Sequence, residues 1–421
     1  MEIQRDLPAR LGSFRRTVLR CPCLYMIAKT SVPSETAQLE SAPAPVSASA
    51  PASAASVLSG WGRLPAPGKE LQSERLESVT RGAALCRGLG RSYGDSSLPA
   101  QPSDKVVSTV LADRLADDSI IDCSPQQHAD LFWASVGGMG LLGHILEVEF
   151  QLEPIASPWI WQESERIGNI DEFLSAFAGT ASQWPMTMGW IDCVSGGSAL
   201  GRGILIAGRW ATPEEAKPSF PAEPRKLTFP FPLPRWSPNP FTNLAHAFNV
   251  AYYYKHIPRQ RRGIVSPETF FYPLDAILHW NRVYGSQGFT QFQCVLPRAA
   301  GAVAVREFMV EVTRLGGASP VCVIKDCGPE GQGLLSFPLE GTSIAIDMAV
   351  TSDTQRIVDR LNDFVIAAGG RIYLTKDRFT RAEHFRAMEP RLPRFLAARE
   401  QWDPGRKLRS AQSVRLFGDR A

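Results

Sequence analysis

The chain has 421 residues, a length that predicts two or three domains. Apolar residues make up 44% and charged residues 21% of it, so a largely disordered protein is excluded. A net charge of only +3, from 45 basic and 42 acidic residues, is a poor match for a nucleic-acid-binding surface, and no apolar run approaches the length of a membrane-spanning helix.

The eight cysteines are scattered, with no C-x-x-C pair and no histidine at the spacing of a zinc site. This usage favours reduced thiols in an intracellular protein over a disulfide framework, and it predicts no metal centre. Only nine of the basic residues are lysines, so a lysine beside a candidate site is informative.

The N-terminal segment, residues 1–56, differs from the remainder of the chain. Ser41–Ser56 consists almost entirely of Ala, Pro and Ser, a composition that cannot build a core. Arg10, Arg15, Arg16 and Arg20 precede it among a few apolar residues. We interpret residues 1–56 as a disordered extension and linker, with a basic targeting or membrane-surface segment as the alternative.

A glycine-rich loop from Arg87 to Asp95 is the first segment that suggests chemistry. Three glycines in seven residues let a ligand approach the backbone closely and expose consecutive N–H groups. Such a nest binds anions, and two arginines add charge suited to phosphate. Tyr93 stands where the Rossmann fingerprint requires its third glycine. The two interpretations are a phosphate-binding loop and an ordinary glycine-rich turn.

A second glycine motif, Gly137–Gly143, fits G-x-G-x-x-G through Gly138, Gly140 and Gly143. Apolar and polar residues then alternate from 146 to 153, which predicts a half-buried strand. A Rossmann-type fold is not expected, because its fingerprint must be followed by a helix. The motif therefore predicts either a loop packed against a flat ligand or a tight turn between two elements.

The segment from Gln291 to Lys376 shows six elements in the order β-α-β-β-α-β. This is the ferredoxin-like arrangement, an antiparallel sheet backed by two helices with one face free to cover something else. The expected strands are Gln291–Leu296, Val321–Lys325, Ser343–Ala349 and Arg371–Thr375, and the expected helices run from about Ala300 to Leu315 and from Asp353 to Gly369.

Polar side chains on this expected sheet are candidate substrate contacts. Gln291 and Gln293 share one strand face, and paired amides suit the recognition of sugar hydroxyls. A solvent-facing strand surface is the alternative interpretation. Lys325 and Lys376 end two strands of the same sheet, and each could equally be an ordinary exposed lysine.

Together these segments resemble the FAD-linked oxidases of the vanillyl-alcohol-oxidase type, and within that group the decaprenylphosphoryl-β-D-ribose 2-oxidase family. The resemblance runs from about Val57 to the C-terminus and rests on ordered blocks rather than on one glycine motif. The blocks are Arg87–Asp95, Asp130–Trp133 with Gly137–Gly143, Gly189–Cys193, Tyr272–Asp275, Asn281–Gly285, Gln291–Gln293 and Tyr373–Asp377, followed by Asp403 and Pro404.

The resemblance implies an α+β, two-domain FAD-linked oxidase fold. A truncated FAD-binding domain would comprise residues 57–155 and would be completed by a C-terminal segment, residues 378–421. A substrate domain of antiparallel sheet would lie between them, at residues 156–377.

The same resemblance implies the members of the site. Lys376 would be the catalytic residue, as an ammonium that orients the substrate or an amine that accepts a proton. Its side chain and that of Tyr373, which would lie against the flavin, can face one cavity only if the chain turns near Thr375. The implied cofactor contacts are Arg87, Gly88, Leu89, Gly90, Arg91, Ser92, Tyr93, Gly94, Gly137, Gly138, Gly143, Ile145 and Tyr373, and the implied substrate contacts are Gln291, Gln293, Lys325 and Lys376.

The reaction implied by the resemblance is the oxidation of the 2-hydroxyl of a polyprenyl-phosphate ribose to a ketone, with a hydride passing to N5 of FAD. A short-chain reductase partner would then reduce the ketone on the other face, so that the two form an epimerase pair for cell-wall arabinan. Such an enzyme would be cytoplasmic or would work at the membrane surface without a transmembrane segment.

Two departures from the family pattern alter these expectations. Asp95 and Asp130 are only 35 positions apart, whereas the family has a long stretch there with a Gly-Lys-Asn-His-His type segment. An internal deletion in the FAD-binding domain is therefore expected. Ser343 and Ala345 stand where the family has an asparagine and a cysteine. Two alternatives stay open: oxidation of a free sugar, alditol or aldonolactone, and a flavin-free, inactive paralogue or truncated gene product.

Overall fold

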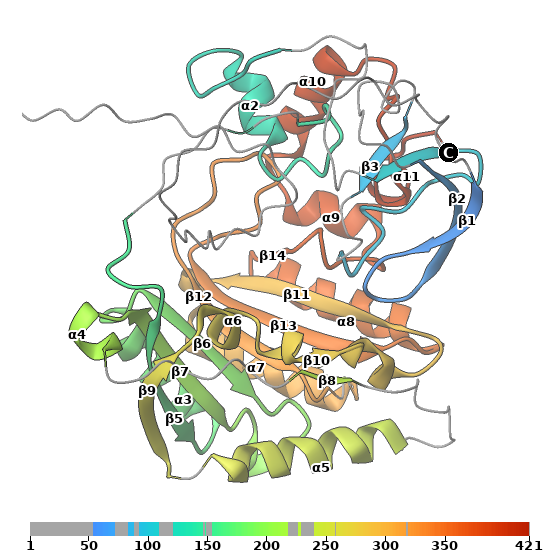
Figure 1. Ribbon diagram of the computed structural model, residues 1–421. Helices are drawn as coiled ribbons and strands as arrows, with labels where there is room; N and C mark the ends of the chain where they lie inside the picture. Colours follow the sequence, from blue (N-terminus) through green and yellow to red (C-terminus); the bar gives the residue numbers. More distant parts are fainter. Residues whose placement is uncertain are drawn as a thin grey trace, which may run out of the picture.

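The computed structural model describes residues 54–71, 83–87, 92–108, 121–145, 148, 154–217, 226–228, 240–256, 258–316 and 319–420 (Figure 1). Nearly all of the expected N-terminal extension lies outside these ranges. The same holds for Gly88–Arg91 and for all but one residue of the expected strand at 146–153. Those expectations stay predictions.

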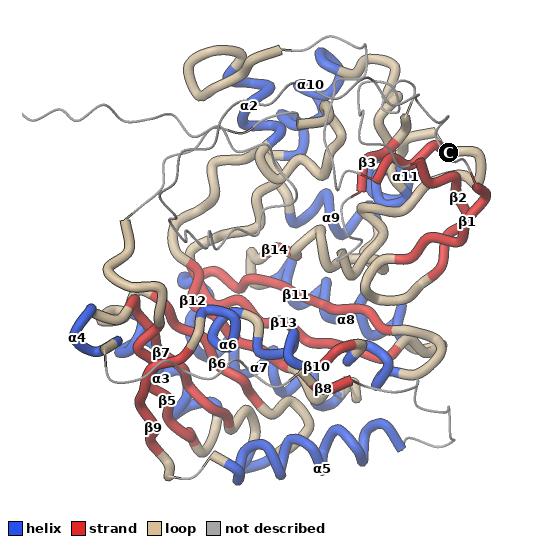
Figure 2. Tube along the Cα trace, viewed as in Figure 1, coloured by secondary structure: helices blue, strands red, loops and turns tan. Residues whose placement is uncertain are grey.

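The centre of the structure is an antiparallel sheet of eight strands (Figure 2). Its order across the sheet is β14 (Arg371–Ile372), β11 (Phe289–Pro297), β13 (Gly341–Ala349), β12 (Cys322–Cys327), β6 (Met186–Ile191), β7 (Gly203–Trp210), β5 (Ile160–Ile167) and β9 (Gln260–Val265). The first four strands, with helices α7 (Gly301–Arg314) and α8 (Thr354–Ala367), form the expected β-α-β-β-α-β unit. That expectation is confirmed, and the sheet is twice as wide as the unit.

The last strand of the unit is shorter than expected. Only Arg371 and Ile372 pair with β11, whereas the sequence predicts a strand to Thr375. The chain leaves the sheet because it turns: the Lys376 N–H donates to the Tyr373 carbonyl at 3.0 Å. The turn required to bring Lys376 and Tyr373 to one side is therefore present.

One face of the sheet carries the main hydrophobic core. Helices α3 (Ile170–Ala181), α7 and α8 cover this face (Figure 1). Their apolar residues recur at helical spacing, as in Val305, Phe308, Met309 and Val312 of α7. They pack against alternate residues of the strands, such as Phe292 and Cys294. The opposite residues of the same strands, which include Gln291 and Gln293, therefore point away from these helices.

A smaller sheet of four strands is built from the N-terminal part of the chain. Its order is β1 (Ala54–Ser59), β2 (Pro65–Leu71), β4 (Lys105–Ser108) and β3 (Leu85–Arg87). The C-terminal segment packs on it: the Arg409 N–H donates to the Ala84 carbonyl at 2.8 Å, and the Arg409 guanidinium pairs with Asp104 at 2.6 Å. This segment contains helices α9 (Ala382–Met388), α10 (Leu392–Trp402) and α11 (Ala411–Phe417).

The remaining elements are short, apart from α5 (Pro240–Lys255), which runs along the large sheet in Figure 1. They are α2 (Ala129–Ser135), α4 (Pro213–Ala216), α6 (Pro267–Phe271), the parallel pair β8 (Leu227–Thr228) and β10 (Ile277–Leu278), and four 3₁₀ turns at Gly197–Ala199, Pro273–Ala276, Trp280–Tyr284 and Arg298–Ala300.

Three further properties concern only the part of the chain that is described. None of its helices combines the length and the apolar character needed to cross a bilayer. No three His, Cys, Asp or Glu side chains gather there in a group suited to a metal ion. The six cysteines within it are free thiols, in line with the reduced cysteines expected from their spacing.

Candidate active site

Five polar side chains lie on the sheet face turned away from α7 and α8. We call this set the polar face, and its members are Gln291, Gln293, Lys325, Ser343 and Asp347. Strand register explains why they share a face: Gln291 is directly opposite Asp347, and Lys325 is directly opposite Ser343. Residues paired in this way across an antiparallel ladder project to the same side.

Asp347 is the buried charge of the polar face, and its side chain has no exposed surface. Its two carboxylate oxygens accept hydrogen bonds from different neighbours, Gln291 Nε2 and, at 3.1 Å, Tyr284 Oη. Burial raises the pKa of Asp347 to about 7, although both donors and the charge of Lys376 oppose this rise. Sequence reasoning missed this residue. The available signal was a lone carboxylate within the apolar run from Ile344 to Ala349.

Gln293 and Lys325 occupy the more open part of the polar face. Gln293 is partly buried and donates from Nε2 to the Ser343 hydroxyl at 3.1 Å. Lys325 is exposed, so it does not share the enclosed position of Asp347. The four candidate substrate contacts thus lie on or beside one sheet in different environments, and their role in substrate binding stays a prediction.

Lys376 reaches the site from the turn that follows β14. Its ammonium nitrogen lies 3.7 Å from the centre of the Tyr93 ring, a cation–π contact between a C-terminal turn and an N-terminal loop. Burial lowers the pKa of Lys376 to about 8, the Asp347 carboxylate opposes this effect, and Lys325 adds to it. The lysine is therefore a partly enclosed group rather than the fully exposed one of the alternative interpretation.

Tyr373 begins the same turn, three residues before Lys376. Its ring stacks on Phe337 with centroids 4.8 Å apart, and its N–H donates to the Gln293 carbonyl at 2.9 Å. Ser336, the neighbour of Phe337, lies against Gly137, where an added Cβ would come within 3.3 Å of it. This series of contacts links Tyr373 to the second glycine motif.

The loop Ser92–Asp95 is packed directly on the Lys376 turn. The Thr375 carbonyl accepts hydrogen bonds from the Tyr93 N–H at 3.2 Å and from the Ser92 hydroxyl at 2.8 Å. A Cβ on Gly94 would lie 1.8 Å from the Asp377 carbonyl oxygen, so only glycine allows this approach.

A buried ion-pair network fastens the same contact. Arg415 of α11 contacts both Asp95, at 2.8 Å, and Asp377, at 2.9 Å. Each carboxylate is less than a tenth exposed. Arg415 thus joins the N-terminal loop, the Lys376 turn and the C-terminal helix, three segments that are distant in sequence.

Arg87 tests whether the N-terminal loop suits a phosphate. Its side chain is 10% exposed, and only Nη2 has a hydrogen-bond acceptor, the Ser59 carbonyl at 3.0 Å. Nε and Nη1 are buried without a hydrogen-bond partner among the described residues, and the Glu70 carboxylate is 3.9 Å away. Buried donors of this kind are rarely left unsatisfied, so Arg87 has two N–H groups to offer an anion such as a pyrophosphate, and its contact with a cofactor stays a prediction.

The second glycine motif ends helix α2 and forms a tight turn. Gly137 and Gly140 have φ values of 75° and 72°, which favour glycine. A Cβ on Gly138 would meet the Ala134 carbonyl at 2.2 Å, so this glycine is required by local packing. Gly143 is partly buried and Ile145 is 52% exposed. The structure leaves their roles in cofactor binding as predictions.

His144, within the same turn region, was not singled out by sequence reasoning. It is 7% exposed, and burial lowers its pKa to about 4, so the imidazole is neutral in the native protein at neutral pH. A single histidine after a glycine motif carries little signal, because its burial depends on the tertiary packing.

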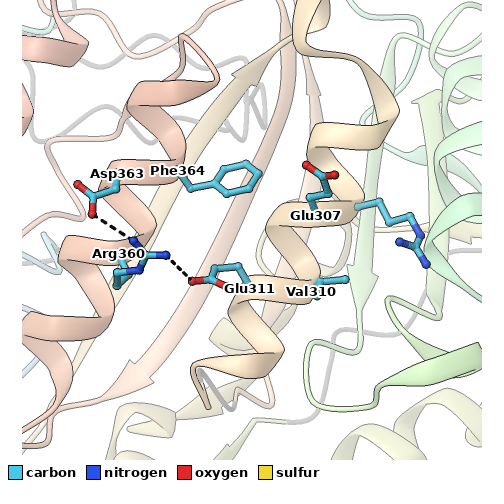
Figure 3. A pocket seen from close by; sticks show the side chains of 7 residues that line it. Glu307, Val310, Glu311, Arg360, Asp363 and Phe364 are labelled. Carbon is cyan, nitrogen blue, oxygen red and sulfur yellow. Dashed lines mark ion pairs between the residues drawn. The ribbon is translucent and has the colours of Figure 1, made fainter.

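A separate hollow of about 460 Å³ lies between α7 and α8, on the helical side of the sheet (Figure 3). Arg360 spans it, with ion pairs of 3.6 Å to Glu311 and 3.7 Å to Asp363. None of the residues that line it is a predicted site residue. Its walls are two basic and three acidic side chains together with Val310 and Phe364.

Comparison with known proteins bears on the interpretation of this site. No profile of a known protein family matches the chain. The chain is 32% identical over 295 residues to the decaprenylphosphoryl-β-D-ribose oxidase of Mycolicibacterium smegmatis. The alignment covers 68% of this chain and 63% of the relative. The resemblance to that family is confirmed. The chain thus spans less than two thirds of this relative's length.

Two other similarities agree with this result. The chain is 27% identical over 306 residues to an uncharacterized protein of Streptomyces coelicolor, covering 68% of this chain and 80% of that protein. A solved variant of BBE-like 1 from Physcomitrella patens superimposes with a TM-score of 0.54 at 11% identity, over 82% of this chain and 91% of the other. The expected α+β fold of FAD-linked oxidases is therefore confirmed.

Proposed function

We propose that this protein is an FAD-dependent oxidoreductase that oxidises a sugar hydroxyl to a ketone. We propose further that its substrate is a polyprenyl-phosphate ribose, which it oxidises at the 2-hydroxyl. The observation that carries the proposal is the position of Lys376. Its amine lies 3.7 Å above the Tyr93 ring, beside the polar face and next to the loop proposed to hold the cofactor.

The chain's own residues would divide the work as follows. Arg87 and the loop that ends at Gly94 would hold the pyrophosphate, because Arg87 has buried donors to offer. Gln293 and Lys325 would bind hydroxyl or phosphate oxygens of the substrate. Bound FAD would supply the two-electron acceptor for the hydride of the sugar carbon.

Lys376 would bind the reacting hydroxyl and either orient it or accept its proton. Its lowered pKa, about 8, lies closer to neutral pH than that of an ordinary lysine. A group whose pKa lies near the working pH is suited to proton transfer. The proton of the alcohol therefore has an acceptor within the site.

The setting of the reaction follows from the same proposal. A lipid-linked substrate would require the enzyme to act at a membrane surface or in the adjoining cytoplasm. A short-chain reductase is the partner suited to reduce the ketone on its other face, which would complete an epimerisation.

The visible absorption spectrum is the first test. We would purify the full chain, incubate it with excess FAD and remove free cofactor by gel filtration. We expect a flavin spectrum that is lost on extensive dialysis, because a shortened cradle provides fewer hydrogen bonds, each worth about 1 kcal/mol. Absence of any bound flavin would contradict the proposal and favour the flavin-free alternative.

Substrate specificity is tested by anaerobic mixing of the flavin-loaded protein with polyprenyl-phosphate ribose. We expect bleaching of the flavin bands, with formation of the ketone at the former 2-hydroxyl. Free ribose, an alditol and an aldonolactone serve as matched controls. Faster bleaching by one of these controls would replace the lipid-linked substrate in the proposal.

A further inference from the structure

The carboxylate of Asp347 is a buried charge to which the proposed reaction has so far assigned no task. It is fully enclosed in the middle of β13. An isolated ionised carboxylate is costly to bury, and in proteins it is hydrogen-bonded and paired with a cation. Gln291 Nε2 and Tyr284 Oη provide two neutral donors, one to each oxygen. The remaining requirement is a positive charge.

Lys376 is the cation that acts on this carboxylate electrostatically, although the two side chains do not form a direct ion pair. It opposes the rise in the pKa of Asp347, and Asp347 in turn opposes the fall in the pKa of Lys376. The groups near the two charges are Lys325 and the buried, neutral thiol of Cys322 on β12, Tyr93 on the N-terminal loop, Tyr284 before β11 and Gln291 on β11. Lys325 is exposed and bears the same charge as Lys376, so Lys325 repels the Lys376 ammonium and Asp347 is the group of opposite charge.

Packing fixes the direction of the carboxylate. Tyr284 stacks on Phe289 with ring centroids 4.5 Å apart and an interplanar angle of 12°. Phe289 also meets the Tyr93 ring edge-on at 5.2 Å, and Lys376 lies over that ring. Asp347 is therefore connected to Lys376 through a rigid aromatic cluster as well as by charge.

We infer that Asp347 is a positioning residue: held by Gln291 and Tyr284, its ionised carboxylate supplies the negative charge that keeps the Lys376 ammonium over the Tyr93 ring and sets how readily that amine releases its proton. This inference rests on the proposed function for the role of Lys376. It also reassigns Gln291, which is buried and donates to Asp347, so that the less buried Gln293 is left as the glutamine more accessible to substrate.

Titration of Lys376 tests the inference without any cofactor or turnover. Because the chain has only nine lysines, isotope labelling at lysine Cε gives a spectrum in which Lys376 is assigned with a Lys376→Arg variant. We would record its titration midpoint in the wild type and in Asp347→Asn, which keeps the shape and removes the charge. The midpoint is expected to fall by about one pH unit or more, a tenfold change in the ionisation equilibrium.

The matched control is Asp326→Asn. Asp326 carries the same charge on the neighbouring strand β12, pairs with Arg298 at 3.2 Å, and projects to the opposite sheet face because its register partner is Thr342. It should leave the Lys376 midpoint unchanged. A Lys376 midpoint that is equal in wild type and Asp347→Asn would overturn the inference.

A second variant covers the case in which Asp347→Asn does not fold. Tyr284→Phe keeps the ring stack and removes one donor to the carboxylate, so Asp347 should ionise less readily and the Lys376 midpoint should fall by a smaller amount. An unchanged midpoint there would again overturn the inference. Because neither measurement needs flavin or substrate, failure of the proposed oxidase activity would be seen separately, in the absorption and bleaching experiments.

Discussion

Replacing Gly94 by alanine tests the contact that joins the N-terminal loop to the Lys376 turn. The new Cβ would lie 1.8 Å from the Asp377 carbonyl oxygen and 2.6 Å from its carbon, whereas ordinary contact begins at 3.4 Å. Both of these atoms belong to the backbone, so no side chain can rotate away. The loop and the turn must move apart by more than an ångström.

The expected cost is obtained by adding the interactions that such a movement disturbs. Overpacking a tight contact costs about 1–3 kcal/mol. The two hydrogen bonds from Tyr93 and Ser92 to the Thr375 carbonyl are worth about 1 kcal/mol each. We therefore expect Gly94→Ala to lower the free energy of unfolding by about 3–5 kcal/mol, with Lys376 displaced from the Tyr93 ring.

Equilibrium unfolding in urea, followed by tryptophan fluorescence, measures this change. The matched control is Gly196→Ala, where an added Cβ meets no atom within 4 Å and the backbone, at φ −107°, suits alanine. It should change stability by less than about 0.5 kcal/mol. If Gly94→Ala unfolded at the same urea concentration as the control, the close approach of loop and turn described above would be refuted.

Three further predictions concern single side chains. Lys376→Ala should slow flavin reduction by substrate on the order of a hundredfold, the usual scale for a positioned acid–base group, whereas the control Lys69→Ala should not. Equal rates for the two variants in stopped-flow bleaching would show that Lys376 takes no part in the chemistry. Arg87→Met should weaken FAD binding about tenfold or more in a fluorescence titration, because a charge-assisted hydrogen bond is worth about 1.5–3 kcal/mol, and unchanged affinity would place the pyrophosphate elsewhere. Burial lowers the pKa of His144 from 6.5 to about 4, so the unfolded chain takes up a proton at a higher pH than the folded protein does. The free energy of unfolding should therefore decline by up to about 3 kcal/mol as the pH falls from 6.5 to about 4. His144→Gln should flatten that decline in urea unfolding, and an equally steep decline would exclude the histidine as its cause.

The β-α-β-β-α-β unit could be predicted from the sequence because its signals are local. Val305, Phe308, Met309 and Val312 recur at helical spacing, and Gly316 and Gly369, both with positive φ, follow the two helices. The addition of β6, β7, β5 and β9 to the same sheet depends on pairing between distant strands. No local pattern indicates which edges will meet.

The site shows the same division. The paired glutamines and Lys376 were identified as candidates from residue type, strand alternation and family resemblance. The carboxylate partner Asp347 was not, because a lone Asp in an apolar strand is recognised as functional only when its neighbours in space are known. The colours of Figure 1 show that β2 and α11, which lie on the same side of the molecule, come from opposite ends of the chain.

What the amino-acid sequence determined by itself was the set of local elements, the glycine-rich loops and the chemical character of the candidate side chains. Tertiary structure alone decided that Arg415 joins Asp95 to Asp377 and that Lys376 lies over Tyr93. The physical reason is range: helix and strand periodicity arises between residues a few positions apart, whereas burial, charge pairing and pKa shifts depend on every segment packed around a group. The chemistry of this site arises from such long-range contacts.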